Sequence, residues 1–570
     1  MIYRTEHPKP QFMRKHWQNL NGLWDFEIDN SNSGQARELF GSNAVFTQKI
    51  NVPFCPESKL SGVAHTDFMN AVWYKRDFEI TAQQLQGCVK LHFGAVDYEA
   101  SIYINGKLCG THKGGYVSFC LDITDFLKEG INTVTVNAVD DTRNRLVPSG
   151  KQSEQYHSYG CFYTRTTGIW QTVWLEFLPK THIVKAKYFS DPTSGLLTIH
   201  AVLNGIGTFR AEAFYEGRPV GHAEVVSQGG DTILAIHLSE IQLWEVGHGR
   251  LYDLKLTYGA DEVSSYFGLR SLHLDGYKFR INERSVFQRL VLDQGFYPDG
   301  LYTAPSDAEL LADVERSLAM GFNGARLHEK VFEERFLYHC DRLGYIVWGE
   351  YPNWGLDHTY ADSIYGILPE WLEEVERDFN HPAIVGWCPF NETWDIKGRK
   401  QFDDLLRMVY LATKAADPTR PCIDVSGNFH VITDIYDLHD YTQDPEEFAA
   451  HYKALGNDNV LDEGYPAFEE RQKYDGKKPF FVSEYGGIRW TQDEAGWGYG
   501  NAPKTAEEFL QRLEGLTDAL LENPYMFAFC YTQLTDIEQE QNGMYTYDRI
   551  PKFPPEQIHR IFSKKAAIED

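Results

Sequence analysis

The most constraining feature of this chain of 570 residues is a change in its hydrophobic period at about residue 271. Beyond that point, short apolar runs alternate with segments whose apolar residues recur every three or four positions, as in strands joined by helices. Eight strand-like runs lie at 287–295, 322–329, 345–351, 384–392, 422–427, 434–441, 480–487 and 527–536. Helical segments between them include 306–320, 329–344, 402–417 and 505–522. This alternation predicts a (β/α)8 barrel, or TIM barrel, for residues 271–570.

The part of the chain before residue 271 has the two-residue period of β-structure instead. Asn105-Gly106, between two alternating stretches, is a strong signal for a tight hairpin. We predict a first β-sandwich over residues 1–180. The shorter repeat of the pattern over 181–270 has the size of an immunoglobulin-like sandwich. No low-complexity linker separates these parts, so the three predicted domains are expected to pack against one another.

Charge and cysteine usage exclude several classes of function. The formal net charge of −27 argues against binding to nucleic acid or to an anionic membrane, because either partner requires a basic face. The sequence has neither the apolar segment of a signal peptide nor a run of about 18 apolar residues that would span a membrane. Its nine cysteines are scattered, odd in number and free of a CxxC pair, which predicts reduced thiols. We expect a cytoplasmic protein that needs neither a metal nor another cofactor.

Polar residues stand at the ends of several predicted barrel strands. Active sites of such barrels lie at the carboxyl ends of the strands, so these residues are candidates for one common site. They are Asp293, Arg326, His328, Glu350, Asn391, Glu392, His439, Tyr441, Glu484, Trp490 and Gln533. Each signal is weak alone, because a glutamate after a strand is usually solvated and a histidine or tryptophan often only packs. Their agreement in one register of the barrel favours a site.

Two of these residues, Glu392 and Glu484, end the fourth and seventh runs and would face one another across the barrel mouth. A retaining glycosidase needs two carboxyl groups about 5–5.5 Å apart, one as nucleophile and the other as acid and then base. Their pKa values must be pushed apart by their surroundings. Tyr441 and Arg326 are candidate donors that would keep the nucleophile ionised. The apolar residues Trp387 to Phe390 are expected to help keep Glu392 protonated.

Several stretches of the chain resemble the family-2 glycoside hydrolases, the group of β-galactosidases, β-glucuronidases and β-mannosidases. They are NLNGLWDFEID, FGAVDYEASIYINGKLCGTHKGGYVSF and TTGIWQTVWLEF in the first 180 residues, and GWCPFNETW and FFVSEYGG in the barrel. The resemblance spans nearly the whole chain. It implies a jelly-roll, sugar-binding-like sandwich, an immunoglobulin-like sandwich and a catalytic barrel, as in the short three-domain members of the family.

The resemblance also implies roles for individual residues. Glu392 would be the general acid/base, Glu484 the nucleophile, and Asn391 a contact of the substrate's 2-hydroxyl. Tyr441 would donate a hydrogen bond to the nucleophile, with Tyr436 as a rival for that place. The remaining strand-end residues are expected to line the substrate site; they are Asp293, Arg326, His328, Glu350, His439, Trp490 and Gln533.

Departures from the family pattern bear on the sugar. The β-glucuronidases hold the uronate carboxylate with an Asn-x-Lys motif after strand eight, whereas residues 532–554 lack it and are acidic. We therefore expect a retaining exo-acting β-galactosidase-like hydrolase. The alternatives within the family are a β-glucuronidase or β-galacturonidase and an arabinosidase or galactofuranosidase. A transglycosylase would use the same residues, and a catalytically inactive sugar-binding barrel is the alternative from another class. The expected partner is a carbohydrate, with self-association into a homo-oligomer as a further possibility.

Overall fold

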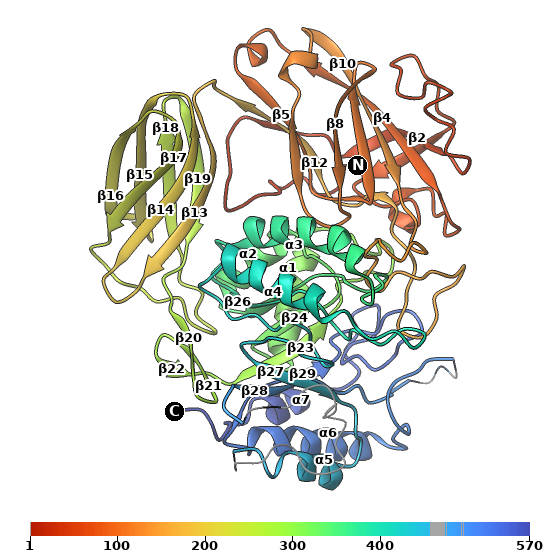
Figure 1. Cartoon of the computed structure of the whole chain (residues 1–570), viewed down its shortest axis with the longest axis vertical. Helices are drawn as coiled ribbons and strands as arrows, with labels where there is room; N and C mark the ends of the chain where they lie inside the picture. The colour runs from red at the N-terminus through yellow and green to blue at the C-terminus, as the bar shows by residue number, and fades with distance from the viewer. Residues whose placement is uncertain (1, 457–473, 475, 492, 494) are drawn as a thin grey trace.

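The computed structural model describes residues 2–456, 474, 476–491, 493 and 495–570. Two β-sandwiches stand side by side and cover one side of a barrel that is formed by the C-terminal half of the chain (Figure 1). The N-terminus lies within the first sandwich, and the C-terminus lies at the left edge of the barrel domain in this view. The predicted architecture of two sandwiches followed by a barrel is confirmed.

The first sandwich has two main antiparallel sheets, in the orders β1-β12-β5-β9 and β3-β2-β4-β10-β7-β8, and a short pair, β11-β6. Its strands are β1 (Trp17–Asn19), β2 (Gly22–Ile28), β3 (Gln48–Val52), β4 (Ala71–Ile80), β5 (Cys88–Phe93), β6 (Val96–Asp97), β7 (Glu99–Ile104), β8 (Lys107–Lys113), β9 (Phe119–Asp122), β10 (Gly130–Val139), β11 (Gly168–Ile169) and β12 (Val173–Leu178). Three 3-10 helices connect them: η1 (Lys59–Ser61), η2 (Gln84–Gln86) and η3 (Thr124–Phe126). The predicted hairpin joins β7 to β8, with Asn105 and Gly106 at φ 52° and 79° as a tight hairpin turn requires.

The second sandwich pairs a sheet of order β13-β14-β17 with one of order β16-β15-β18-β19. Its strands are β13 (His182–Asp191), β14 (Leu196–Asn204), β15 (Gly207–Tyr215), β16 (Arg218–Ser227), β17 (Gly230–His237), β18 (Tyr252–Tyr258) and β19 (Asp261–Phe267). Alternate residues along β18 are buried, so the two-residue period of the sequence becomes one buried and one solvated face.

A small sheet, β20-β21-β22, then leads into the barrel. Its strands are β20 (Leu272–Asp275), β21 (Lys278–Ile281) and β22 (Arg284–Ser285).

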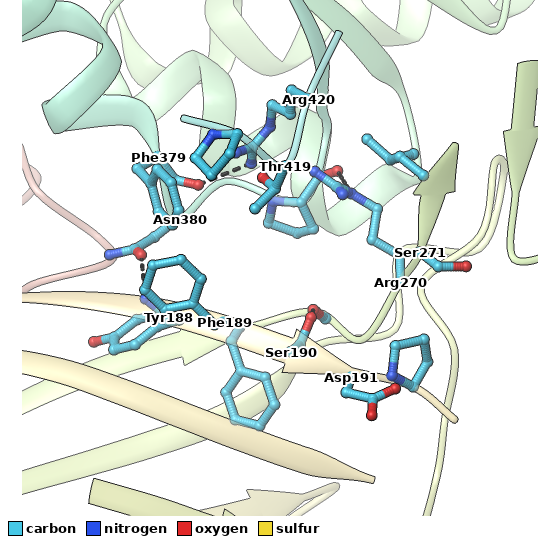
Figure 2. A pocket seen from close by; sticks show the side chains of 16 residues that line it. Tyr188, Phe189, Ser190, Asp191, Arg270, Ser271, Phe379, Asn380, Thr419 and Arg420 are labelled. Carbon is cyan, nitrogen blue, oxygen red and sulfur yellow. Dashed lines mark hydrogen bonds between the residues drawn. The ribbon is translucent and has the colours of Figure 1, made fainter. Parts of the chain in front are cut away.

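A pocket of about 480 Å³ lies at the junction between the second sandwich and the barrel (Figure 2). Its walls are hydrogen-bonded across the junction. The side chain of Asn380 accepts from the Tyr188 amide and donates to the Ala186 carbonyl, both at 2.8 Å. Arg270 donates to the carbonyls of Pro382 and Ile384 at 2.6 and 2.7 Å. These bonds tie strand β13 and the connecting segment to the barrel.

The barrel sheet contains seven regular parallel strands in the order β26-β25-β24-β23-β29-β28-β27. They are β23 (Gln288–Asp293), β24 (Gly324–Leu327), β25 (Ile346–Glu350), β26 (Ile384–Cys388), β27 (Tyr436–Asp440), β28 (Phe480–Gly486) and β29 (Met526–Thr532). The helices are α1 (Asp307–Ala319), α2 (Glu334–Leu343), η4 (Ala361–Ser363), α3 (Ile364–Asp378), α4 (Asp403–Ala416), α5 (Pro445–Tyr452), α6 (Ala506–Leu521) and α7 (Pro555–Phe562). Helices α1 to α4 lie toward the sandwiches, and α5 to α7 lie on the opposite side (Figure 1).

The fifth predicted strand, 422–427, is the one run that does not form a regular strand. Its backbone pairs with β26 only at isolated bridges, Trp387 with Cys422 and Asn391 with Ser426. The carboxylate of Asp424 accepts hydrogen bonds from three backbone amides, 425, 431 and 432, and contacts the His430 ring. These local bonds hold this part of the chain in a loop, and a local side-chain cap of this kind competes with a regular ladder. The segment still fills the fifth position between β26 and β27.

Capping residues set the helix ends as the sequence requires. The side chain of Ser306 accepts from the amide of Glu309 at the start of α1, and Thr505 does the same for Glu508 at α6. Helix α2 ends at Gly344, which is left-handed at φ 67°. In the described part of the chain, no helix combines the length and the apolar character that a membrane crossing requires.

Candidate active site

Glu392 lies four residues beyond β26, at the carboxyl end of the barrel. Its amide donates to the carbonyl of Ser426 at 2.9 Å, so the fifth segment fixes the backbone there. The backbone φ is 46°, in the left-handed region, which costs a residue other than glycine about 1 kcal/mol. Strained backbone of this kind persists where the surrounding structure imposes it, and it concentrates at functional sites. The side chain is 19% exposed.

Glu484 lies within β28, and donors hold both of its carboxylate oxygens. The Tyr441 hydroxyl donates to Oε2 at 2.5 Å, and the Arg326 guanidinium donates to Oε1 at 3.2 Å. The Tyr441 hydroxyl also contacts Thr532 at 3.0 Å, and its ring stacks on Tyr499 with centroids 3.4 Å apart. Burial raises the pKa of Tyr441, so its phenol stays a donor at neutral pH. These donors hold both oxygens of Glu484 in a fixed orientation.

His439, at the end of β27, bridges the two glutamates. Its Nδ1 lies 2.7 Å from Oε1 of Glu392, and its Nε2 lies 3.4 Å from Oε1 of Glu484. A carboxylate oxygen of each glutamate and a His439 ring nitrogen all lie within 4.8 Å of one another. That spacing is closer to the roughly 5–5.5 Å of retaining glycosidases than to the roughly 6.5–9.5 Å of inverting ones. The same three groups are close enough to hold a metal ion, and the expectation that none is needed stays a prediction.

The charge state of the Glu392–His439 pair differs from the sequence expectation. Burial raises the pKa of Glu392, but the hydrogen bond and positive charge of His439 outweigh it, so the pKa lies below its ordinary value. Burial lowers the pKa of His439, but Glu484 and Glu392 outweigh it and raise the pKa overall. The apolar residues before Glu392 therefore do not keep it protonated in the ligand-free site. A neighbouring imidazolium, which the hydrophobic pattern could not reveal, decides its charge.

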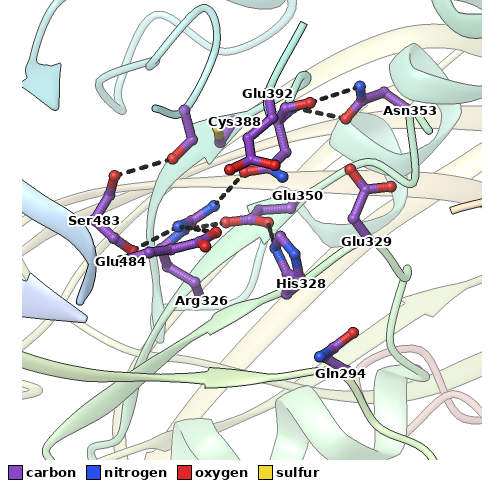
Figure 3. Close-up of polar contacts among 12 residues, drawn as sticks. Gln294, Arg326, His328, Glu329, Glu350, Asn353, Cys388, Glu392, Ser483 and Glu484 are labelled. Carbon is purple, nitrogen blue, oxygen red and sulfur yellow. Dashed lines mark hydrogen bonds and ion pairs between the residues drawn. The ribbon is translucent and has the colours of Figure 1, made fainter. Parts of the chain in front are cut away.

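Arg326, in β24, organises the floor of the site. Its guanidinium lies between Glu350 and Glu484, with a further contact to Asn391 Oδ1 at 3.3 Å (Figure 3). The second oxygen of Glu350 contacts His328 Nδ1 at 3.0 Å. Burial holds the pKa of His328 well below its usual value, so the ring is neutral. Five predicted residues, from the ends of β24 and β25, from β28 and from the segment after β26, thus form one network.

The side-chain nitrogen of Asn391 has no hydrogen-bond partner among the described residues. The side-chain oxygen of Asn391 contacts Arg326, while the nitrogen, Nδ2, is buried. The backbone of Asn391 is fixed by Asn353, which accepts from its amide at 2.7 Å and donates to its carbonyl at 3.0 Å. An oriented donor without a partner at this place is available to a substrate hydroxyl.

Three predicted residues lie outside the cluster around the two glutamates. The Asp293 carboxylate accepts from the Gly295 amide at 2.9 Å and so closes the turn after β23. Trp490 packs against Phe509 and Phe553. Gln533 accepts from Gln294 at 2.7 Å and donates to Asn542 at 2.9 Å, so it belongs to a separate network of side-chain amides.

Sequence reasoning missed several groups at the barrel mouth. Glu329 is buried and left-handed at φ 50°, with Oε1 unpartnered among the described residues. Trp354 donates from Nε1 to the Asn391 carbonyl at 3.1 Å. Glu540 accepts from the Tyr163 hydroxyl of the first sandwich at 2.5 Å. Glu329 ends the run 322–329, and Trp354 follows the run 345–351, so the strand pattern gave a signal for both. No strand pattern in the sequence predicts that a residue of the sandwich, such as Tyr163, lies at the barrel mouth.

The first sandwich also builds a pocket of about 350 Å³ beside Glu392. Its walls combine residues from the two domains, among them Arg145, Gln152 and Phe162 from the sandwich and Trp354, His358 and Trp394 from the barrel. Glu392 lines this pocket and Glu484 does not. The sandwich therefore takes part in the site.

Two family models match the chain. The model described as "Glycosyl hydrolases family 2, sugar binding domain" matches residues 17–176. The model described as "Glycosyl hydrolases family 2, TIM barrel domain" matches residues 306–498.

Similar proteins carry two kinds of name. A β-glucuronidase of Streptococcus agalactiae serotype V is 23% identical over 96% of this chain and 95% of its own length. A putative β-glucuronidase of Formosa agariphila is 27% identical over 60% of this chain, and a β-galactosidase of Thermoanaerobacter pseudethanolicus is 25% identical over 66%. The chain spans only 42% and 50% of the lengths of these last two proteins. The solved β-glucuronidase of Ruminococcus gnavus, 18% identical, aligns over 99% of both chains with a TM-score of 0.80, which establishes the shared fold.

Proposed function

Because the chain belongs to glycoside hydrolase family 2, we propose that it is a retaining exo-glycosidase that removes a terminal β-linked sugar. One observation carries the proposal: the carboxylates of Glu392 and Glu484 have oxygens within 4.8 Å of one another at the carboxyl end of the barrel. Both groups are present and oriented, which argues against an inactive sugar-binding barrel.

Glu484 is the nucleophile in this proposal. Its ionised carboxylate attacks the anomeric carbon and forms a covalent glycosyl ester as the leaving oxygen departs. Tyr441 and Arg326 keep it charged and hold both of its oxygens. The unpartnered Nδ2 of Asn391 donates to the 2-hydroxyl of the sugar, a bond that strengthens in the transition state.

Glu392 is the acid and then the base. In the ligand-free site, the proton that the leaving oxygen needs resides on His439, 2.7 Å from the Glu392 carboxylate. We assign His439 the role of supplying it to Glu392 along this hydrogen bond. Glu392 protonates the leaving oxygen and later deprotonates the water that releases Glu484. The pocket that Glu392 lines without Glu484 lies on the side where the leaving group departs.

The sugar proposed first is a β-glucuronide. A relative that aligns over nearly the whole chain is a β-glucuronidase, and this name supports putting the β-glucuronide ahead of the β-galactoside that sequence reasoning put first. A β-galactoside is the second candidate, because another relative is a β-galactosidase and residues 532–554 contain no Asn-x-Lys motif.

A panel of nitrophenyl glycosides tests the proposal. We expect hydrolysis of the β-glucuronide or β-galactoside, and loss of at least about 10⁴-fold in kcat when Glu484 is replaced by glutamine, because no covalent ester can form. Near-normal turnover by Glu484→Gln would contradict the proposed mechanism. Failure to hydrolyse any glycoside of the panel would contradict the proposed activity.

Added azide distinguishes the roles of the two glutamates. In Glu392→Ala, a substrate with a good leaving group can still form the ester, and azide should attack it to give a β-glycosyl azide at an increased rate. Glu484→Ala has no ester to intercept, so azide should yield no β-glycosyl azide. The opposite pattern would exchange the two roles.

A further inference from the structure

A loop of the first sandwich reaches the barrel mouth. The Ser149 amide donates to the Trp354 carbonyl at 2.7 Å, and the Gly150 amide donates to the same carbonyl at 3.0 Å. Gly150 is left-handed at φ 53°, and a Cβ there would lie 2.5 Å from the Glu329 carbonyl. Only glycine fits such a close approach without displacing the barrel backbone. The next residue, Lys151, is thereby delivered into the site.

The Lys151 side chain lies over the aromatic wall of the site. Its Nζ is 3.6 Å from the ring centroid of Trp354, and the residue is only 6% exposed. The Trp354 ring donates in turn to the carbonyl of Asn391, the residue before Glu392. One indole ring therefore separates the ammonium from the Asn391–Glu392 segment.

Lys151 is exceptional among the buried cations in the described part of the chain, because its ammonium makes no hydrogen bond and no ion pair. The other buried cations all have such partners; they are Arg4, Arg14, Arg165, Arg289, Arg326, Lys330 and Arg420. A cation–π contact compensates only partly for the cost of removing a charge from water. The Lys151 ammonium is therefore available to an anionic group of a bound substrate.

Nearby carboxyl groups do not take that place. Glu329 and Glu540 lie close enough to act on Lys151 electrostatically, but burial raises the pKa of each and so favours their neutral forms. Glu392 is engaged with His439. Burial lowers the pKa of Lys151, but neighbouring groups, with Cys161 and the Glu392 carboxylate first among them, raise it overall.

The buried and half-buried cations near the strand ends of the barrel already have partners in the part that the structure describes. Arg326 is shared between Glu350 and Glu484. After β29, Lys552 is paired with Asp536 at 2.6 Å, and Arg549 donates to Asp313. An anionic group on the bound sugar would therefore find Lys151 of the sandwich as a buried cation that is still available.

We propose that Lys151 binds the carboxylate of a terminal uronic acid residue of the substrate and thereby sets the preference for uronides. This inference rests on the proposed function, since it assumes that the sugar bound at the two glutamates is the one that is cleaved. In the closed complex the ammonium and the carboxylate pair in a site from which water is excluded, where charged hydrogen bonds are strong.

Two substrates that differ at one carbon test the proposal: nitrophenyl β-D-glucuronide, with a C6 carboxylate, and nitrophenyl β-D-glucoside, with a C6 hydroxymethyl group. We expect Lys151→Met to lower kcat/KM on the glucuronide by about 100-fold or more and to change it less than about 3-fold on the glucoside. Lys151→Arg keeps the charge and should retain most of the activity on the glucuronide.

The matched control is Arg143→Met. Arg143 belongs to the same segment and also lies over an aromatic ring, that of Phe68 at 4.2 Å, but it is paired with Asp141 and half exposed. It should leave both substrates unchanged. In a Glu484→Gln background, calorimetry with D-glucuronic acid should show weaker binding when Lys151 is also replaced by methionine.

Three outcomes would overturn the inference. Equal losses on both substrates would show that Lys151 acts only on the field at Glu392. Unchanged kcat/KM on the glucuronide, or unchanged binding of D-glucuronic acid, would show that it does not contact the carboxylate. A wild-type enzyme that cleaves only neutral glycosides would also refute it while leaving the retaining mechanism, tested by Glu484→Gln, intact.

Discussion

Two regions of this molecule contain basic side chains that differ in their hydrogen bonding. At the junction between the second sandwich and the barrel, Arg420 donates to the carbonyls of Phe379 and His381 and to Asp417, and Arg270 donates to two further carbonyls (Figure 2). At the barrel mouth, the ammonium of Lys151 and the Nδ2 of Asn391 have no hydrogen-bond partner among the described residues.

The difference distinguishes buried polar groups that stabilise the fold from those that are available to a substrate. Buried polar groups are normally hydrogen-bonded, because an unmade bond costs free energy. The junction follows this rule and so contributes to stability. The barrel mouth departs from it at Asn391, Glu329 and Lys151, near the two proposed catalytic carboxylates, where a substrate can make the missing bonds. The two pockets differ little in volume. They differ clearly in whether their buried polar groups have hydrogen-bond partners.

The largest expected effect comes from Arg326, which is fully paired yet lies in the site. Arg326→Met should lower kcat by at least about 10³-fold, because Glu484, the proposed nucleophile, loses a donor and buried Glu350 keeps only the His328 ring as a partner. It should also lower the free energy of unfolding by about 3–5 kcal/mol. Urea unfolding and steady-state kinetics measure the two effects. A variant with normal stability would show that Glu350 finds another partner.

The next effect concerns pH. The raised pKa of His439 stabilises the fold fully below the ordinary value of 6.5, and this stability is lost as pH rises through the raised pKa. The lowered pKa of Glu392 stabilises the fold above the ordinary value of 4.5, and this stability is lost as pH falls through the lowered pKa. The ion pair is therefore strongest between 4.5 and 6.5.

His439→Asn tests this window. It should lower the free energy of unfolding by about 2 kcal/mol near the middle of the window, with a smaller difference at either side. Urea unfolding of both proteins at a series of pH values measures it. A difference that does not vary with pH would contradict the charged pair.

A smaller effect is expected at the junction. Arg270→Met removes the donors for two carbonyls and should lower the free energy of unfolding by about 1–2 kcal/mol. The kcat/KM on the hydrolysed nitrophenyl glycoside should stay within 2-fold of wild type, roughly the scatter of such comparisons. A large loss of activity at normal stability would mean that the junction communicates with the site.

The smallest expected effect has the opposite sign. Lys151→Met removes a buried cation without a partner, so the ligand-free protein should be as stable as wild type or more stable by up to about 1 kcal/mol. Thermal unfolding without ligand measures it, with Arg143→Met as the paired counterpart. Marked destabilisation would mean that Lys151 already has a structural partner.

The barrel and its two glutamates could be predicted from the sequence because both are periodic features. Strand ends meet at one edge of a barrel, so Glu392 and Glu484 come together whatever the loops do. The choice between Tyr441 and Tyr436 needed the structure. Tyr441 contacts Glu484, whereas Tyr436 packs on Phe480 at the start of the strand.

The rest of the site depends on contacts that no local pattern encodes. The lowered pKa of Glu392 comes from a histidine 47 positions away in the chain. Lys151 reaches the site only because the sandwich loop packs on the loop after β25. The loss of the fifth strand follows from side-chain bonds of Asp424 that compete with the ladder.

The delivery of Lys151 by Gly150 divides labour between two domains. The two carboxylates that we propose break the glycosidic bond belong to the barrel, while the proposed determinant of substrate choice belongs to a loop of the sandwich. Insertions, deletions and substitutions are tolerated best in surface loops, which carry few packing constraints. A lineage could therefore change the sugar that it consumes by altering one loop of an accessory domain, with the catalytic barrel inherited untouched.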